Sequence, residues 1–265
     1  MTIAILLGVL IGALLGLTGA GGGLLAVPAL VQSFGWSMQQ AGAVSLIAVS
    51  ISAAIGAWDG YRNRLLRWRG ALLMAGVGIP MTWVGAYFAA QFSQTTLQAI
   101  FAGAMIVAAV RMLYQATPDK LSEGELDVGR LATVCEKTGR FQWNTATTLI
   151  LAGIGAITGA LTGLLGVGGG FIMVPLLRRF SNVSMHGIVA TSLSVIALVG
   201  TFGVIGSFAR GITLPMLPTA LFTASCIAGM FLGRKLAQHL AAQTIQKSFA
   251  ALLLIVAAWL IWQVI

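Results

Sequence analysis

Long apolar runs dominate this sequence and restrict what it can fold into. Eight apolar segments are separated by short polar stretches, at 2–34, 40–58, 70–91, 96–115, 144–180, 185–208, 215–239 and 242–264. Several of them exceed the ~20 residues that a helix needs to cross a bilayer. Because only 8% of the residues are charged, against about 25% in a soluble domain, we expect an all-α polytopic membrane protein.

The net charge of +9 has a simple explanation in such a chain. Lys and Arg flank membrane spans and set their orientation, so we expect the lipid bilayer as a partner and no nucleic acid. The first apolar run lacks a basic segment before it and is too long for a signal peptide, so we expect no cleavage. Cys135 and Cys226 indicate neither a disulfide framework nor a metal site.

The chain consists of two similar halves. When the sequence is shifted by 147 positions, Gly12–Leu30 aligns with Gly159–Leu177, and 12 of these 19 positions are identical. We therefore predict a first transmembrane repeat at 1–115, a cytoplasmic polar linker at 116–142 and a second transmembrane repeat at 143–265. The linker holds five of the six acidic residues. Internal repeats of this kind are typical of secondary transporters.

The distribution of basic residues favours inverted over parallel repeats. If the first segment of each half folds back at its glycines, three spanning helices follow it and the halves are inverted, with both termini outside. Fourteen basic residues then lie on the cytoplasmic side and only Arg210 lies outside. Parallel repeats of four spans each, the alternative, give a split of ten to five, which obeys the positive-inside rule less well.

Consecutive glycines interrupt the first apolar segment of each half, and we expect them to break the helix. Irregular backbone at membrane depth is tolerated only against protein or a wet cavity, and paired breaks at matched positions indicate a transport site. The chain re-enters a helix near Leu24 and near Phe171, and a helix N-terminus favours an anion. The predicted substrate-binding residues are Gly21, Gly22, Gly23, Ser45, Gly168, Gly169, Gly170, Thr191 and Ser192.

Each of these residues also has a structural interpretation. Glycines four residues apart, such as Gly12 and Gly16, allow close packing of helices. Ser45 and Ser192, which correspond in the two repeats, can instead bond their own helix backbone. The glycine loops match neither a Walker phosphate loop nor a dinucleotide fingerprint. We expect no enzymatic activity, no cofactor and no metal.

The duplicated G-L-x-G-x-G-G-G-x-x-x-V-P-x-L motif, with A-x-S-L downstream, resembles the TauE/SafE family of membrane transporters. The resemblance covers essentially the whole chain. It implies a carrier of sulfite, organosulfonates or related sulfur-containing anions across the bacterial cytoplasmic membrane. One departure is that Val44 stands where the second repeat has Thr191, so the first half offers fewer hydroxyl donors.

The sequence thus predicts a secondary transporter that exports a small anion, sulfite or another sulfur oxyanion or organosulfonate. The alternatives are an anion channel and a non-transporting membrane subunit. No carboxylate lies in the middle of a span, which argues against the buried proton relays of many pumps. The substrate, the coupling ion and the oligomeric state, a homo-oligomer included, are left open by the sequence.

Overall fold

The computed structural model describes residues 2–18, 22–116, 143–181, 183–237 and 242–264. Within these ranges the chain forms ten α-helices, six of which are long and apolar enough to cross a membrane. The architecture is that of a helical, multi-pass membrane protein, as the apolar runs predict. The predicted linker lies outside the described residues except for Ala116.

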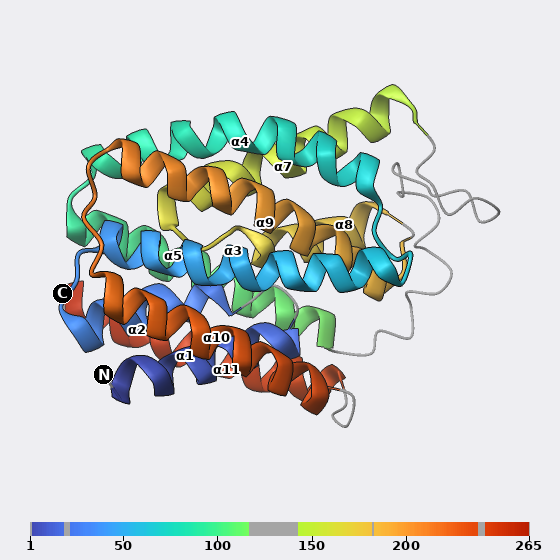
Figure 1. Ribbon diagram of the computed structural model, residues 1–265. Coiled ribbons are helices and arrows are strands. Elements are labelled where there is room, and N and C mark those ends of the chain that lie inside the picture. The colour runs from blue at the N-terminus through green and yellow to red at the C-terminus, as the bar shows by residue number, and fades with distance from the viewer. Residues whose placement is uncertain (1, 19–21, 117–142, 182, 238–241, 265) are drawn as a thin grey trace.

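Each half contributes five helices in the same order. One helix and a second, much shorter one are followed by three long helices (Figure 1). The first half contains α1 (Thr2–Thr18), α2 (Gly23–Phe34), α3 (Met38–Arg62), α4 (Trp68–Gln91) and α5 (Gln94–Ala116). The second half contains α7 (Thr145–Leu165), α8 (Gly170–Phe180), α9 (Met185–Ala209), α10 (Met216–Ala237) and α11 (Ala242–Val264).

Both predicted helix breaks are confirmed. The first lies between the end of α1 and the start of α2, and the second lies between α7 and α8. Each short helix then returns toward the end of the bundle from which the preceding helix came (Figure 1). The return of α2 ends at Gly35, whose φ of 64° is a left-handed conformation that closes many helices.

Helices α3 and α9 form the centre of the bundle and run antiparallel. Their contacts pair the end of one helix with the start of the other: Gly60 with Ala190, Gly56 with Leu193, Ser50 with Gly200 and Leu46 with Gly203. These two equivalent helices therefore point in opposite directions, as Figure 1 also shows.

The outer helices exchange partners between the halves. Helix α1 packs on α10 of the second half, and α7 packs on α4 of the first half. Both contacts depend on glycines at four-residue spacing. A Cβ on Gly12 or Gly16 would collide with the α10 backbone, and one on Gly159 or Gly163 would collide with the α4 backbone. The packing interpretation of these glycines is confirmed, because without side chains the backbones approach closely.

The two ends of the bundle differ in charge. The end that holds the α3–α4 turn is called the basic end below, because the helix ends that carry most of the described Arg and Lys residues lie there (Figure 1). These residues are Arg62, Arg64, Arg67, Arg69, Arg111, Arg178, Arg179, Arg234, Lys235 and Lys247. The other end, where the α9–α10 connection lies, has Arg210 as its only cation among the described residues. It is called the Arg210 end.

Candidate functional site

The two helix breaks meet near the centre of the bundle. Gly23, at the start of α2, lies directly against the backbone of Val167 in the second break, and a Cβ at this glycine would collide with the Val167 carbonyl. Gly168 lies between the two central helices, where a Cβ would contact Val49 of α3 and Ile196 of α9. Val49 and Ile196 are equivalent residues of the two repeats. Because both lie beside Gly168, the second break is close to the point where α3 and α9 cross.

Each break leaves a helix N-terminus inside the protein. The residues that start α2 and α8 are buried, and no side chain caps either helix at Gly22 or Gly169. The first N–H groups of a helix have no partner within it, and the helix dipole places partial positive charge there. Two buried, uncapped N-termini near one another are therefore suited to an anion.

Two threonines of α7 lie beside the second break. Gly169 has φ of 60°, and a Cβ there would collide with the methyl group and the carbonyl of Thr158 and approach the hydroxyl of Thr162. The Thr162 hydroxyl donates to the carbonyl of Thr158 at 2.7 Å. The Thr158 hydroxyl is fully buried and has no hydrogen-bond partner in the described structure. An unpaired buried hydroxyl is costly, so a ligand or water beside it would satisfy an unmet bond.

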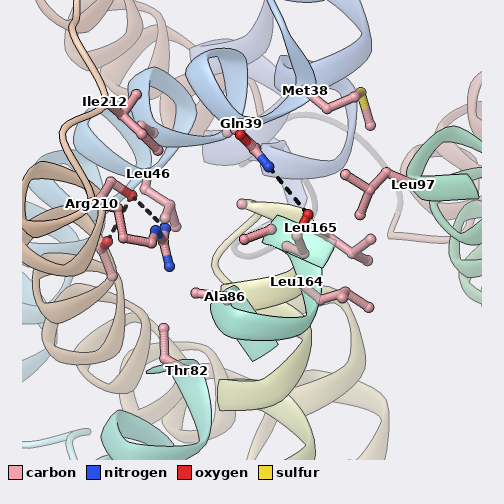
Figure 2. Close-up of a pocket in the computed structure, with 18 residues that line it drawn as sticks. Met38, Gln39, Leu46, Thr82, Ala86, Leu97, Leu164, Leu165, Arg210 and Ile212 are labelled. Atoms are coloured by element: carbon pink, nitrogen blue, oxygen red, sulfur yellow. Dashed lines mark hydrogen bonds between the residues drawn. The ribbon is translucent and has the colours of Figure 1, made fainter. Parts of the chain in front are cut away.

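A pocket of about 200 Å³ leads from the Arg210 end toward this region (Figure 2). Its walls come from α3, α4, α5, α7 and α9, and its floor includes Gly163–Gly166 next to the second break. The lining is mostly apolar, and small residues such as Gly42, Ala43 and Ala86 leave the space open. Sites for drug-sized ligands span about 300–1,000 Å³, so this pocket suits a smaller molecule.

The polar groups of the pocket are concentrated near its mouth. Gln39 donates from Nε2 to the carbonyl of Ala89 at 3.2 Å, and Arg210 donates from Nη2 to the hydroxyl of Ser207 at 3.4 Å. Partial burial lowers the pKa of the Arg210 guanidinium, but arginine stays protonated in proteins. Arg210 has no carboxylate partner among the described residues. The ion pair within that part of the chain joins Arg234 and Asp59, at the basic end. The pocket thus offers an uncompensated positive charge.

The predicted site residues divide into those near the break and those along the central helices. Gly22, Gly23, Gly168, Gly169 and Gly170 lie where the two breaks meet. Gly21 lies outside the described residues. These glycines are packed closely against protein, so their ligand role stays a prediction.

The structure does not bring Ser45 and Ser192 together. Leu46 lies beside Gly203 and Leu193 lies beside Gly56, which separates the levels of the two serines along α3 by roughly 18 Å at 1.5 Å per residue. Both hydroxyls are fully buried and have no hydrogen-bond partner among the described residues. Their burial without partners leaves ligand binding at each serine a prediction.

Thr191 is engaged in protein contacts. Its hydroxyl donates to the carbonyl of Gly187 at 2.7 Å and accepts from the backbone N–H of Arg67 at 3.2 Å. It joins α9 to the start of α4 at the basic end, so in this conformation the hydroxyl is not turned toward a ligand.

Sequence reasoning missed Thr158, Thr162 and Arg210 as candidate site residues. The sequence holds a signal for the two threonines, because the repeat aligns them with the apolar residues Ile11 and Leu15. A polar residue in one repeat where the other repeat has an apolar one indicates a role that only one half has. The sequence identifies Arg210 only as the one basic residue on the outer side of the predicted topology. Its place in the pocket depends on the turn after α9, which the sequence does not specify.

Comparisons with known proteins indicate a family. A family profile described as "Sulfite exporter TauE/SafE" matches residues 4–260. A "Probable membrane transporter protein" from Xylella fastidiosa (strain Temecula1) is 29% identical, over 97% of this chain and 93% of the relative. Probable membrane transporter proteins from Methanocaldococcus jannaschii and Bacillus subtilis are 26% and 23% identical, over 77% and 98% of this chain and 71% and 97% of those relatives. No solved structure matches the chain.

Proposed function

Because the chain belongs to the sulfite exporter TauE/SafE family, we propose that it is a secondary transporter that exports a small anion across the bacterial cytoplasmic membrane. The substrate we propose is sulfite or another sulfur oxyanion or organosulfonate. The relatives are named as probable membrane transporters, which agrees with transport and names no substrate.

One observation carries the anion proposal. The pocket with the uncompensated guanidinium of Arg210 leads to the floor formed by the second break, and the buried N-terminus of α8 begins just beyond it. A cation at the mouth attracts an anion, and neutral N–H and hydroxyl donors further in can bind it without the tight grip of a buried bidentate arginine. Release, which transport requires, then stays fast.

The proposed architecture is a pair of inverted repeats. It is supported by the antiparallel course of α3 and α9 and by the reciprocal contacts of α1 with α10 and of α7 with α4. We place the basic end in the cytoplasm because basic residues are enriched on that side. Both termini and the pocket mouth then face the outside, and the pocket belongs to an outward-facing conformation.

A carrier fits this structure better than a channel. The pocket opens at the Arg210 end, whereas at the basic end α3 and α9 are in close contact through Gly60 and Ala190. Export of an anion is favoured by the membrane potential, which is worth about 2.3 kcal/mol per charge for every 100 mV. No carboxylate in the described helices lies at mid-span, so we propose that substrate charge, and not a buried proton relay, supplies this drive.

Counterflow in proteoliposomes tests the proposal. Vesicles that contain the purified protein are loaded with unlabelled sulfite and diluted into radiolabelled sulfite. We expect transient, saturable accumulation of label, which a carrier gives and a channel does not. Sulfoacetate, taurine, sulfate, thiosulfate and acetate as competitors define the substrate class. Absence of flux for every anion in this set would refute the proposed function.

A further inference from the structure

The pocket at the Arg210 end has a structural counterpart at the basic end. The central helices correspond at the repeat offset of 147, and packing fixes the correspondence of α4 with α10. Gly16 of α1 packs on Met230 of α10, and its equivalent Gly163 of α7 packs on Thr82 of α4. Each residue of α4 therefore matches the residue 148 positions later in α10.

This correspondence places an arginine where the pocket has an alanine. Ala86, which lines the pocket, matches Arg234. The other main wall residues match small or apolar residues at the basic end: Ala43 with Ala190, Leu46 with Leu193, Gly203 with Gly56 and Ser207 with Gly60. The two sets of walls thus share these small and apolar residues. They differ at Ala86, which matches Arg234, and at four further lining positions: Gln39 matches His186, Gly42 matches Val189, Thr82 matches Met230 and Arg210 matches Asn63.

At the basic end the matching walls are closed. Gly60 contacts Ala190, and Gly56 contacts Leu193. The guanidinium of Arg234 lies over Gly56, where a Cβ would be 2.7 Å from Nη2. The arginine side chain fills the space that the short Ala86 leaves open in the pocket.

A protein carboxylate holds this arginine. Arg234 Nη1 lies 3.3 Å from Asp59 Oδ2, and Asn63 Nδ2 donates to the other carboxylate oxygen at 3.3 Å. Asp59 is the only acidic residue in the described part of the chain. Its carboxylate thus occupies the position at which an anion would meet Arg234. In the second repeat the residue equivalent to Asp59 is Gly206. The Arg210 end therefore lacks a matching carboxylate, and the charge of Arg210 is uncompensated among the described residues.

We infer that the basic end holds a second anion-binding pocket, closed in this structure, in which Arg234 is the anion-binding residue and the Asp59 carboxylate occupies the anion's position. This inference rests on the proposed function and extends it to the inward-facing state. The Asp59 and Arg234 side chains are 61% and 28% exposed, and exposed ion pairs contribute little to stability. A substrate anion can therefore compete with Asp59 for the arginine when the helices separate.

Cysteine accessibility tests this inference with a matched pair of positions. Leu46→Cys reports on the pocket at the Arg210 end, and Leu193→Cys reports on its counterpart. Both are made with Cys135→Ser, while Cys226 is retained because it is fully buried. Purified protein in nanodiscs is treated with a small methanethiosulfonate reagent. We expect rapid modification of the first cysteine and slow modification of the second.

Asp59→Asn should then open the basic end. We expect several-fold faster modification of Leu193→Cys and slower modification of Leu46→Cys, while Arg62→Gln, which removes an exposed charge from the same end, changes neither rate. Sulfate or sulfoacetate should protect Leu193→Cys in the Asp59→Asn protein, and adding Arg234→Gln should abolish that protection. Monodisperse elution of each variant establishes that it is folded.

The outcomes separate the two proposals. An unchanged Leu193→Cys rate in Asp59→Asn overturns the inferred pocket. A faster rate without anion protection, while the same anions protect Leu46→Cys, overturns the anion-binding role of Arg234 and leaves the proposed function intact. If the anions protect neither cysteine and sulfite shows no counterflow, the proposed function fails as well.

Discussion

The two helix breaks have nearly the same sequence and very different surroundings. In the first, a Cβ on Gly22 would meet Ile11 and Leu15 of α1. In the second, a Cβ on Gly169 would meet Thr158 and Thr162 of α7. The duplicated glycines therefore precede their helices in different conformations, since Gly22 is right-handed and Gly169 left-handed, and only Gly169 has a side-chain hydroxyl, that of Thr162, beside it. We therefore expect the second break to supply more of the substrate contacts than the first.

The largest expected effect tests the second break directly. Gly169→Leu should abolish counterflow, because the left-handed φ of 60° and the contact with Thr158 both exclude a side chain. Gly22→Leu should also abolish it, through collision with α1.

Gly153→Leu is the matched control, since a Cβ at this α7 glycine meets nothing within 4 Å. Counterflow is measured after confirming membrane insertion by quantitative immunoblot. Normal counterflow in both the Gly22 and Gly169 variants would leave the breaks with a packing role only.

Substituting Arg210 should give the next largest effect. Arg210→Gln removes the uncompensated charge at the pocket mouth, and a hydrogen bond to a charged group is worth about 1.5–3 kcal/mol. We expect the dissociation constant for the best anion to rise roughly 10-fold to 100-fold, as measured by calorimetry in detergent.

The control for this charge is Arg62→Gln, which removes an exposed arginine at the basic end and should leave affinity unchanged. Equal affinity in Arg210→Gln and wild type would show that the pocket binds its ligand without this guanidinium.

The serines test whether equivalent positions are functionally equal. Ser45 and Ser192 are both buried and unpaired, so Ser→Ala should not reduce the free energy of unfolding. If a hydroxyl binds the anion, its loss costs roughly 0.5–3 kcal/mol, a few-fold to about 100-fold in affinity. The pocket at the Arg210 end lies on the Ser45 side of the central helices, so we expect Ser45→Ala to have the larger effect in detergent. Wild-type affinity in both variants would remove the serines from the site.

Much of the fold follows from local sequence, and much of the site does not. The helix starts near Leu24 and Phe171 were predicted within one residue of Gly23 and Gly170, because glycine runs and apolar periodicity act locally. The separation of Ser45 from Ser192 is a consequence of the antiparallel central helices, in which equivalent positions lie at opposite depths unless they are close to the crossing point.

Long-range packing accounts for what the sequence could not supply. The glycine motifs of the two repeats align at an offset of 147 residues, whereas Ala86 and Arg234 align at 148. This second offset is known only from the packing of Gly16 on α10 and of Gly163 on α4. The contact of Gly23 with Val167 joins segments from different halves, and no local pattern specifies it.

The smallest expected effect sharpens the comparison of the two breaks most. Thr158→Val keeps the shape of the side chain and removes an unpaired, fully buried hydroxyl. Because that hydroxyl has no partner to lose, the free energy of unfolding should stay the same or rise by up to about 1 kcal/mol. Anion affinity should nevertheless fall about 2-fold to 10-fold, the range of a neutral hydrogen bond of about 0.5–1.5 kcal/mol.

The control for this hydroxyl is Ile11→Thr, which places a hydroxyl at the matching position of the first break and should leave affinity unchanged. Calorimetry on both variants, with thermal unfolding of each, measures the two quantities. A fall in affinity with unchanged stability in Thr158→Val, absent from Ile11→Thr, assigns the hydroxyl to the ligand. If Thr158→Val binds as tightly as wild type, the difference between the breaks is one of packing alone.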